Sequence, residues 1–231
     1  MIYIGGDLHG NLNQLIEHTA ALRLKEDDIL ILLGDVGINY TGGERDHRFK
    51  QQLCQVLPVT YFCIKGNHEN DAKNLSTYHE ECFHEGTVYV EDEFPRLKFA
   101  KDGETYHFEG KNCMVIGGAY SVDKWYRLRN GYPWFEDEQP DDAVKAKVRQ
   151  SLEAANWKMD VFLTHTCPLK YEPREVFLQG IDQSLVDKTT EVFLDEIEQR
   201  CQYQKWYCGH YHTEKEIDDM IFLYETIQPF I

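Results

Sequence analysis

The sequence has no long hydrophobic run: no apolar stretch approaches the roughly 20 residues that a membrane-spanning helix needs. A secretion signal is also missing, because the strand-like run Ile2-Tyr3-Ile4 directly follows Met1, without a basic segment or a small-residue cleavage site. We therefore expect a protein that does not span a membrane and that resides in the cytoplasm.

Paired cysteines are missing as well. The seven cysteines are an odd number, form no Cys-x-x-Cys pair and mostly lie inside apolar runs such as residues 61–64. This distribution indicates buried thiols in a reducing compartment, and it disfavours a disulfide framework or a zinc knuckle.

Positive charge is scarce. The 24 Lys and Arg residues stand against 40 Asp and Glu residues, which gives a formal net charge of −16. Such a balance argues against general attraction to extended nucleic acid or to an anionic membrane. A local cationic site supplied by bound metal remains compatible with it.

Enough apolar material is present for one compact core. The chain has 231 residues, of which 42% are hydrophobic and 13% aromatic, a size and composition that suit a single folded domain. No internal repeat, low-complexity tract or Pro/Gly/Ser-rich linker divides the sequence. We expect one domain over residues 1–231.

Short apolar runs alternate with segments of helical periodicity. Seven runs predict buried strands: Ile2–Ile4, Ile29–Leu33, Val59–Ile64, Met114–Ile116, Val161–Leu163, Trp206–Cys208 and Ile221–Tyr224. Helical spacing follows capping residues in three segments: 12–22 behind Asn11, 144–155 behind Asp141 and Asp142, and 185–197 behind Ser184. This alternation predicts an α/β fold. Residues 87–117 depart from it, because their short runs and the turn signals at Asp102-Gly103 and Gly110 predict antiparallel strands.

Polar residues follow five of the predicted strands. In open α/β sheets, ligands bind beyond the carboxyl ends of the strands. The five segments at those ends are Gly5-Gly6-Asp7-Leu8-His9-Gly10, Gly34-Asp35-Val36-Gly37, Lys65-Gly66-Asn67-His68-Glu69, Thr164-His165-Thr166-Cys167-Pro168 and Gly209-His210-Tyr211-His212. A single Gly-Asp is commonly a turn and a single buried His is commonly a core residue, but five such ends together indicate a site. The other five histidines, 18, 47, 79, 84 and 107, are expected to be ordinary surface or packing residues.

The side chains at these ends predict a metal centre. Two Asp, one Asn and several His suit borderline to hard divalent ions such as Mn, Fe, Zn, Co or Ni. Seven candidate ligands exceed what one tetrahedral ion takes. Two ions about 3.5–4 Å apart, sharing a carboxylate, would accommodate them and would suit in-line phosphoryl displacement.

In this order, the five motifs resemble those of the calcineurin-like metallophosphoesterase superfamily: Asp-x-His, Gly-Asp, Gly-Asn-His-(Glu/Asp), His and Gly-His-x-His. The match extends from residue 7 to residue 212. The resemblance implies a four-layer α/β/β/α sandwich with two mixed sheets and a metal pair at one edge.

The resemblance also implies a role for each motif residue. Asp7, His9 and His212 would hold the first metal ion, Asn67, His165 and His210 would hold the second, and Asp35 would bridge the two. His68 would be the catalytic histidine, which assists the leaving group while a metal-bridging hydroxide attacks phosphorus. The expected cofactors are two divalent ions, with Mn expected first.

The second motif differs from the pattern of one branch of this superfamily. The protein serine/threonine phosphatase branch extends its second motif to Gly-Asp-x-Val-Asp-Arg-Gly, whereas this sequence reads Gly34-Asp35-Val36-Gly37-Ile38-Asn39-Tyr40. The Asp that pairs with the catalytic His in that branch is missing, as is the Arg. We therefore expect a bacterial-type phosphoesterase outside that branch, with any other carboxylate partner of His68 unidentified.

Two segments are candidates for substrate contacts. Residues 121–135 combine Arg127 and Arg129 with five aromatic residues, which favours either a substrate-facing loop or a packed crossover whose arginines pair with residues 136–138. Residues 42–48 predict a polar loop that either lines the rim of the site or is simply solvated. The substrate is expected to be a small or nucleotide phosphodiester or a phosphomonoester.

Two functions from other classes stay open. A non-catalytic, metal-stabilised interaction module is one, although the intact set of motif residues speaks against it. A di-metal oxidoreductase is the other, and it would show redox-dependent spectra. The sequence does not determine an oligomeric state.

Overall fold

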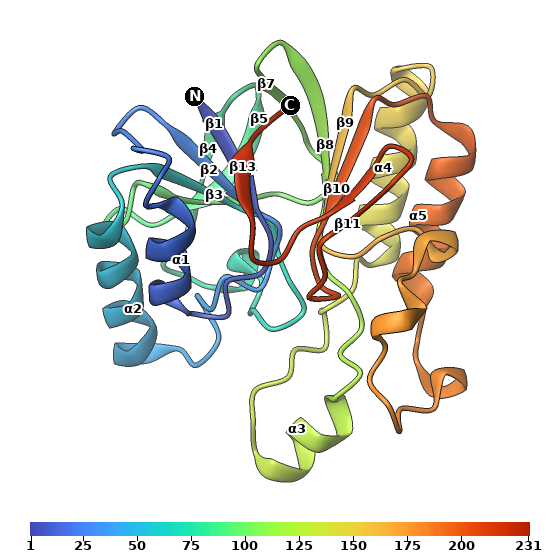
Figure 1. The fold of residues 1–231 in the computed structure, drawn as a ribbon, viewed down its shortest axis with the longest axis horizontal. Helices are drawn as coiled ribbons and strands as arrows, with labels where there is room; N and C mark the ends of the chain where they lie inside the picture. Colours follow the sequence, from blue (N-terminus) through green and yellow to red (C-terminus); the bar gives the residue numbers. More distant parts are fainter.

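The computed structural model describes residues 1–231 and contains two β-sheets with helices on their outer faces (Figure 1). The strands are β1 (Ile2–Gly5), β2 (Ile29–Leu32), β3 (Thr60–Cys63), β4 (His79–Phe83), β5 (Gly86–Val90), β6 (Leu97–Ala100), β7 (Thr105–Phe108), β8 (Lys111–Ile116), β9 (Val161–Thr164), β10 (Lys205–Cys208), β11 (Lys215–Ile217), β12 (Met220–Phe222) and β13 (Ile227–Pro229). The helices are α1 (Leu12–Thr19), α2 (Gly43–Val56), α3 (Lys124–Asn130), α4 (Asp142–Ala154) and α5 (Thr189–Arg200). Four 3₁₀ turns are η1 (Ala72–Asn74), η2 (Leu169–Tyr171), η3 (Arg174–Val176) and η4 (Gln183–Leu185).

Both sheets are mixed, with parallel strands at their centres. The seven-stranded sheet has the order β13-β1-β2-β3-β6-β5-β4, and the six-stranded sheet has the order β11-β12-β10-β9-β8-β7. Strands β1, β2, β3 and β6 are mutually parallel, as are β12, β10, β9 and β8, while the outer strands pair in antiparallel fashion. The carboxyl ends of the parallel strands therefore share one edge of each sheet.

Three apolar layers hold the sandwich together. The central layer, which includes Ile4, Phe62, Val115 and Leu163, lies between the two sheets. A second layer packs α1 and α2 against the seven-stranded sheet, and a third packs α4 and α5 against the six-stranded sheet (Figure 1). These layers confirm the expected α/β/β/α architecture with two mixed sheets.

The helix predictions are partly correct. Asn11 caps α1 by accepting a hydrogen bond from the Gln14 backbone, and Asp141 caps α4 in the same way through Val144. The predicted start at Ser184 is wrong, because this residue lies in a separate 3₁₀ turn and α5 begins at Thr189.

Two helices occupy segments that the sequence predicted as loops. Residues 42–48 lead into α2, which buries one side of a largely polar sequence at Lys50 and Leu53. Residues 121–135 contain α3, whose seven residues include none that is buried. The expected polar loop at 42–48 is therefore wrong, because residues 43–48 lie within α2.

The antiparallel middle segment is confirmed but divides between the sheets. Strands β5 and β6 pair in the seven-stranded sheet, whereas β7 and β8 pair in the six-stranded sheet. The chain thus passes from one sheet to the other within residues 100–105.

The helices and the cysteines bear on the expectations about membrane spans and disulfides. None of the five helices combines the length and the apolar character that crossing a bilayer requires. All seven cysteines are free thiols, and five of them are buried; Cys54 is partly exposed and Cys82 is exposed on β4.

Candidate metal centre and active site

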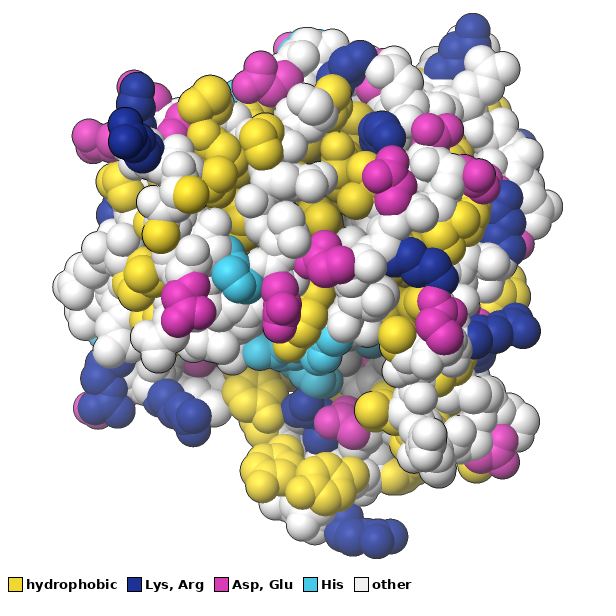
Figure 2. Space-filling model, viewed as in Figure 1, with side chains coloured by type: hydrophobic (Ala, Val, Ile, Leu, Met, Phe, Trp, Pro, Cys, Tyr) yellow, Lys and Arg dark blue, Asp and Glu magenta, His cyan; other side chains and the backbone are white.

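The five motif segments meet at the shared carboxyl edge of the two sheets. Asp7, Asp35 and Asn67 follow β1, β2 and β3 of the seven-stranded sheet, while His165 and His210 follow β9 and β10 of the six-stranded sheet. Figure 2 shows histidine side chains gathered at the surface just above the segment that projects from the lower side of the molecule. The site therefore lies at the junction of the sheets, as the motif order predicts.

Several candidate ligands occupy a sterically unfavourable backbone conformation. His9, Asp35, His210 and His212 have φ values of 47°, 46°, 67° and 49°. A non-glycine residue in this left-handed region carries a strain of order 1–3 kcal/mol, which persists where the surrounding structure enforces it. The clustering of four such residues at one edge is typical of a functional site.

Two glycines allow the strand ends to approach one another. A Cβ atom at Gly34, whose φ is +103°, would overlap the His165 ring, and a Cβ atom at Gly66 would overlap the Asp35 carboxylate. Any larger residue at these positions would push the neighbouring loops apart.

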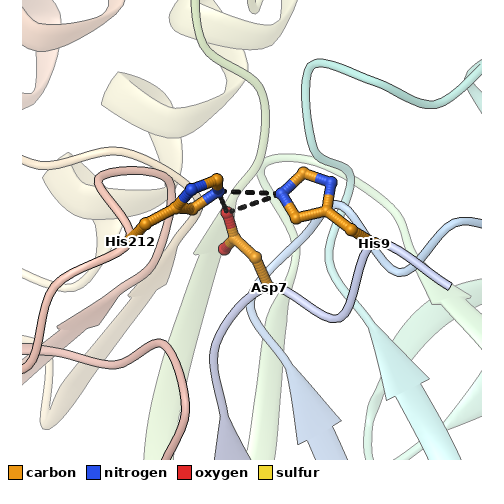
Figure 3. Close-up of side chains that lie close together, drawn as sticks. All are labelled: Asp7, His9 and His212. Carbon is orange, nitrogen blue, oxygen red and sulfur yellow. Dashed lines mark hydrogen bonds and ion pairs between the residues drawn. The ribbon is translucent and has the colours of Figure 1, made fainter. Parts of the chain in front are cut away.

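Asp7, His9 and His212 form the first group of candidate ligands (Figure 3). The Nε2 atoms of His9 and His212 lie 2.8 Å apart, and Asp7 Oδ2 lies 3.7 Å and 3.3 Å from them. Asp7 Oδ2 is buried and has no hydrogen-bond partner. A buried carboxylate oxygen beside two converging imidazole nitrogens fits a divalent cation, because a cation satisfies all three acceptors.

The charge state of this group agrees with that interpretation. Burial disfavours the ionised form of Asp7, but interactions with His212 and His9 outweigh it, so the pKa of Asp7 lies well below its usual range. Burial likewise opposes the charge on His9, yet its pKa is raised by the neighbouring Asp7 and Asp35 carboxylates. The site thus concentrates negative charge that attracts a cation.

His165 and Asn67 present a second pair of acceptors. His165 Nδ1 lies 2.7 Å from the Leu33 carbonyl, which can only accept, so Nδ1 carries the proton in the neutral ring. Its Nε2 atom then directs a lone pair at Asn67 Oδ1, 2.8 Å away. The Asn67 amide nitrogen donates to Ser121 Oγ at 2.9 Å, which fixes its oxygen toward the centre. Two acceptors that face each other fit a shared cation.

Asp35 lies between the two groups. Its Oδ2 atom is 3.9 Å from His9 Nε2 and 3.8 Å from His165 Nε2, and the carboxylate is buried. Its Oδ1 atom accepts a hydrogen bond of 2.9 Å from the His68 backbone. This central position suits a bridging carboxylate.

The His210 side chain lies beside the second group without joining the tightest clusters of ligand atoms. Its ring centroid is 5.0 Å from that of His165, and its backbone nitrogen donates to Asp7 Oδ1 at 2.9 Å. Burial in the first place, and the neighbouring His165 in the second, lower the pKa of His210 to about 3. The ring is therefore neutral and retains a lone pair, as a metal ligand requires.

His68 has a carboxylate partner that sequence reasoning did not find. Its Nε2 atom lies 3.7 Å from Asp123 Oδ1, and its Nδ1 atom lies 3.1 Å from Arg127 Nη2 and 3.5 Å from Asp35 Oδ2. Burial raises the pKa of Asp123, but interactions with His68 and Arg127 prevail and lower it to about 2. Asp123 comes from the segment before α3, so only its position within 121–135 hinted at a role.

The two candidate arginines of α3 are placed differently. Arg127 Nε donates to both Asp123 oxygens at 2.8 Å, and its Nη1 atom donates to the Tyr40 hydroxyl at 3.0 Å. Arg129 is exposed and lies outside the cavity beside the metal centre. Neither pairs with residues 136–138, and the structure brings only Arg127 to His68.

Glu69 joins two of the motif loops from within the protein. It is buried, and its carboxylate accepts backbone hydrogen bonds from Val36, Gly37 and Gly66. Burial and the charge of Asp35 raise its pKa to about 8. The last residue of the third motif therefore positions Asp35 and Asn67 and does not itself face the site.

Comparisons with known proteins agree with this geometry. A family model described as calcineurin-like phosphoesterase matches residues 1–214. The fold resembles the crystal structure of TT1561 from Thermus thermophilus, with a TM-score of 0.51 and 13% sequence identity over 96% of this chain and 87% of that one. AQ665 from Aquifex aeolicus, a protein of unknown function, has 16% identity over 74% of this chain and 81% of that one, and its TM-score of 0.31 carries no structural argument. A comparison with curated proteins found no match.

Proposed function

Because the chain belongs to the calcineurin-like phosphoesterase family, we propose that it hydrolyses phosphoesters with the help of two divalent metal ions. The observation that carries this proposal is the convergence of unsatisfied acceptors: the buried Asp7 Oδ2 atom has no partner, and two imidazole nitrogens lie 2.8 Å apart beside it. Together with the facing acceptors of Asn67 and His165, they form two neighbouring cation sites joined by Asp35.

Seven residues would hold the ions. Asp7, His9 and His212 would bind the first. Asn67, His165 and His210 would bind the second, and Asp35, which lies within 4 Å of both His9 and His165, would bridge them. When bound, the ions polarise the phosphoester and supply an activated water near neutral pH. Manganese is our first choice, because these nitrogen and oxygen donors suit it and no thiolate is among them.

His68 would protonate the leaving oxygen. An imidazole at the edge of the centre, partly exposed and 3.7 Å from the ionised Asp123, can carry that proton. Asp123 holds the ring in position. Arg127 anchors Asp123 through two hydrogen bonds and contacts the ring itself, so it acts as a positioning residue.

The substrate of this enzyme would be small. A cavity of about 380 Å³ adjoins the centre, and neither lysine nor arginine lines it, so an extended polyanion finds no basic track there. Both a small or nucleotide phosphodiester and a phosphomonoester fit the site. The enzyme would work as a single domain over residues 1–231, in the cytoplasm.

The alternative is a non-catalytic module that keeps the fold and binds metal. The position of His68 speaks against it, because a module without turnover has no need for an imidazole held beside the centre by Asp123 and Arg127.

Hydrolysis of bis-p-nitrophenyl phosphate and p-nitrophenyl phosphate tests the proposal, on protein that has been stripped with a chelator and reconstituted with Mn(II). We expect metal-dependent release of p-nitrophenol from at least one ester, and the preferred ester identifies the diester or the monoester as substrate. Metal binding without hydrolysis of either ester or of a broad ester panel would support the non-catalytic module.

A further inference from the structure

The cavity beside the metal centre has one apolar wall. This wall is formed by the segment that contains η3 and η4, through the side chains of Val176, Phe177, Leu178, Ile181 and Val186. Phe177 stacks on Tyr211 with ring centroids 6.0 Å apart and planes 17° apart. Leu178 keeps 64% of its surface exposed. An exposed apolar wall next to a polar centre is typical of a site that takes an apolar part of a ligand.

The cavity is also acidic. Its carboxyl groups are those of Asp35, Asp123, Glu172 and Glu191, and neither lysine nor arginine lines it. Two of them are neutralised nearby, since Arg127 pairs with Asp123 and Lys188 pairs with Glu172 at 2.7 Å. The two proposed metal ions would balance the negative charge of Asp35. Glu191 is the group without a cationic partner.

Only one oxygen of the Glu191 carboxyl group has a hydrogen-bond partner. Glu191 is 4% exposed, and its Oε1 atom accepts a hydrogen bond of 2.8 Å from Thr166 Oγ1, whereas its Oε2 atom is buried without a partner. Buried polar atoms normally have a hydrogen-bond partner. A ligand in the cavity that carries an N–H or ammonium group would supply the donor that the protein does not.

We propose that this cavity binds the leaving group of the substrate, and that this group is a ring-sized apolar alcohol or phenol with an N–H or ammonium donor for Glu191. The inference rests on the proposed hydrolase function. The cavity volume of about 380 Å³ suits a group of this size. We expect a leaving group with further phosphates or a carboxylate to be disfavoured, because it would meet Glu172 and Glu191 with neither lysine nor arginine lining the cavity.

In the proposed hydrolysis, one bond to phosphorus forms and one bond to phosphorus breaks. A water oxygen forms a bond to phosphorus and releases one proton to solvent, while the bond from phosphorus to the leaving oxygen breaks. The leaving oxygen takes a proton from His68, and solvent then returns a proton to His68. The cavity residues contribute only binding, so their effect is a preference among leaving groups of equal chemical reactivity.

Three aryl phosphates isolate that preference: the O-phosphates of tyramine, of 4-methylphenol and of 3-(4-hydroxyphenyl)propionate, each also prepared as its methyl diester. Their phenols have similar acidity, so the esters differ mainly in the group that reaches Glu191. We expect kcat/KM to fall in this order by roughly tenfold per step. An equal rate for all three, with hydrolysis intact, overturns the inference and leaves the proposed function standing.

Variants of the cavity residues test whether the cavity causes this preference among leaving groups. Glu191→Gln keeps the shape and removes the charge that the carboxyl carries above about pH 7, so at about pH 8 it should bring the ratio of amine to carboxylate ester close to one. Leu178→Ser should raise KM for all three aryl esters by about threefold to tenfold relative to glycerol phosphate. Leu185→Ser is the control, because Leu185 is 77% exposed on the same segment but does not line the cavity. An unchanged ratio in Glu191→Gln contradicts the assignment.

Binding of the free phenols separates this inference from catalysis. Calorimetry of the manganese-loaded protein with tyramine and with 3-(4-hydroxyphenyl)propionate should show tighter binding of tyramine, and Glu191→Gln should remove the difference. This outcome would support the cavity's specificity even if no ester were hydrolysed, in which case the proposed function alone would fail. Equal or absent binding of both phenols overturns the inference.

Discussion

The edge of the sheets and the segments that project beyond it differ in how they are built. At the edge, candidate ligands follow buried strands directly, and close contacts across Gly34 and Gly66 fix them. The projecting segments, residues 117–141 and 169–188, contain only α3 and short 3₁₀ turns (Figure 1). They also expose apolar side chains. Trp125, Tyr126 and Leu178 are all more than half exposed. The rigid edge suits chemistry, whereas the projecting segments suit recognition of the organic part of a substrate.

Removing the shared carboxylate should have the largest effect. Asp35→Asn weakens both cation sites at once, because Asp35 Oδ2 lies within 4 Å of His9 and His165. We expect loss of bound metal and a fall in activity on the order of a thousandfold or more. Metal analysis beside the hydrolysis assay checks this, with the exposed Asp182→Asn as control. Full metal occupancy in Asp35→Asn would argue against a bridging role.

His68→Ala should separate chemistry from metal binding. The variant loses the proton donor but keeps all seven proposed ligands, so both ions should stay while kcat falls by about 10²–10⁴-fold. His9→Ala, by contrast, should lose metal from the first group. If His68→Ala released metal instead, His68 would belong among the ligands, a possibility that its 3.5 Å distance to Asp35 makes worth testing.

Glu191, which lines the cavity, should make the stability of the folded protein depend on pH. The pKa of its carboxyl is raised from an ordinary value of 4.5 to about 7, mainly by burial and in part by the facing Glu172, while hydrogen bonds from the backbone and from Thr166, and the charge of Lys188, oppose the shift. The folded state therefore holds a proton that the unfolded state has released, and the stability that this proton contributes is complete below pH 4.5 and lost as pH rises through 7.

Glu191→Gln should consequently be more stable than the wild type at about pH 8, by up to about 3 kcal/mol, and no more stable than it at about pH 4. Chemical denaturation at the two pH values measures this difference, because glutamine does not titrate. A difference that does not change with pH would show that the carboxyl of Glu191 is not perturbed.

The two arginines of α3 should differ, although the sequence alone presents them as equivalent. Arg127→Met removes the contacts to Asp123 and His68, and we expect about a tenfold loss of kcat with metal retained. Arg129→Met changes an exposed side chain that does not line the cavity, so its effect should be smaller. Equal losses would mean that Arg129 also reaches the substrate.

The edge of the molecule could be predicted from sequence for a physical reason. Strands buried on both faces give continuous apolar runs, so their ends are visible, and Asp7, Asp35 and His165 stand just beyond them. Because the strands are parallel, their carboxyl ends lie at the same edge of the sheet, so no further sequence signal is needed to predict that these residues meet. The same reasoning located α1 and α4, whose capping residues Asn11 and Asp141 precede clear periodicity.

The projecting segments could not be predicted in this way. Helix α3 buries no residue, so its sequence carries no apolar period, and α2 buries Asp46 and Lys50 among few apolar residues. The partnership of Asp123 with His68 joins residues far apart in the sequence, at a distance set by the path of the chain and not by a motif. The apolar cavity wall likewise depends on how η3 and η4 turn back toward the centre.

The central claim is that two ions joined by Asp35 make the edge of the sheets a catalyst. Titration of Mn(II) into the chelator-stripped protein, with bound metal and p-nitrophenyl ester hydrolysis followed in the same samples, tests it most directly. We predict that hydrolysis rises as the second equivalent binds and reaches its plateau at two ions per chain. Full activity at one ion per chain, or two bound ions with no hydrolysis, would contradict this account.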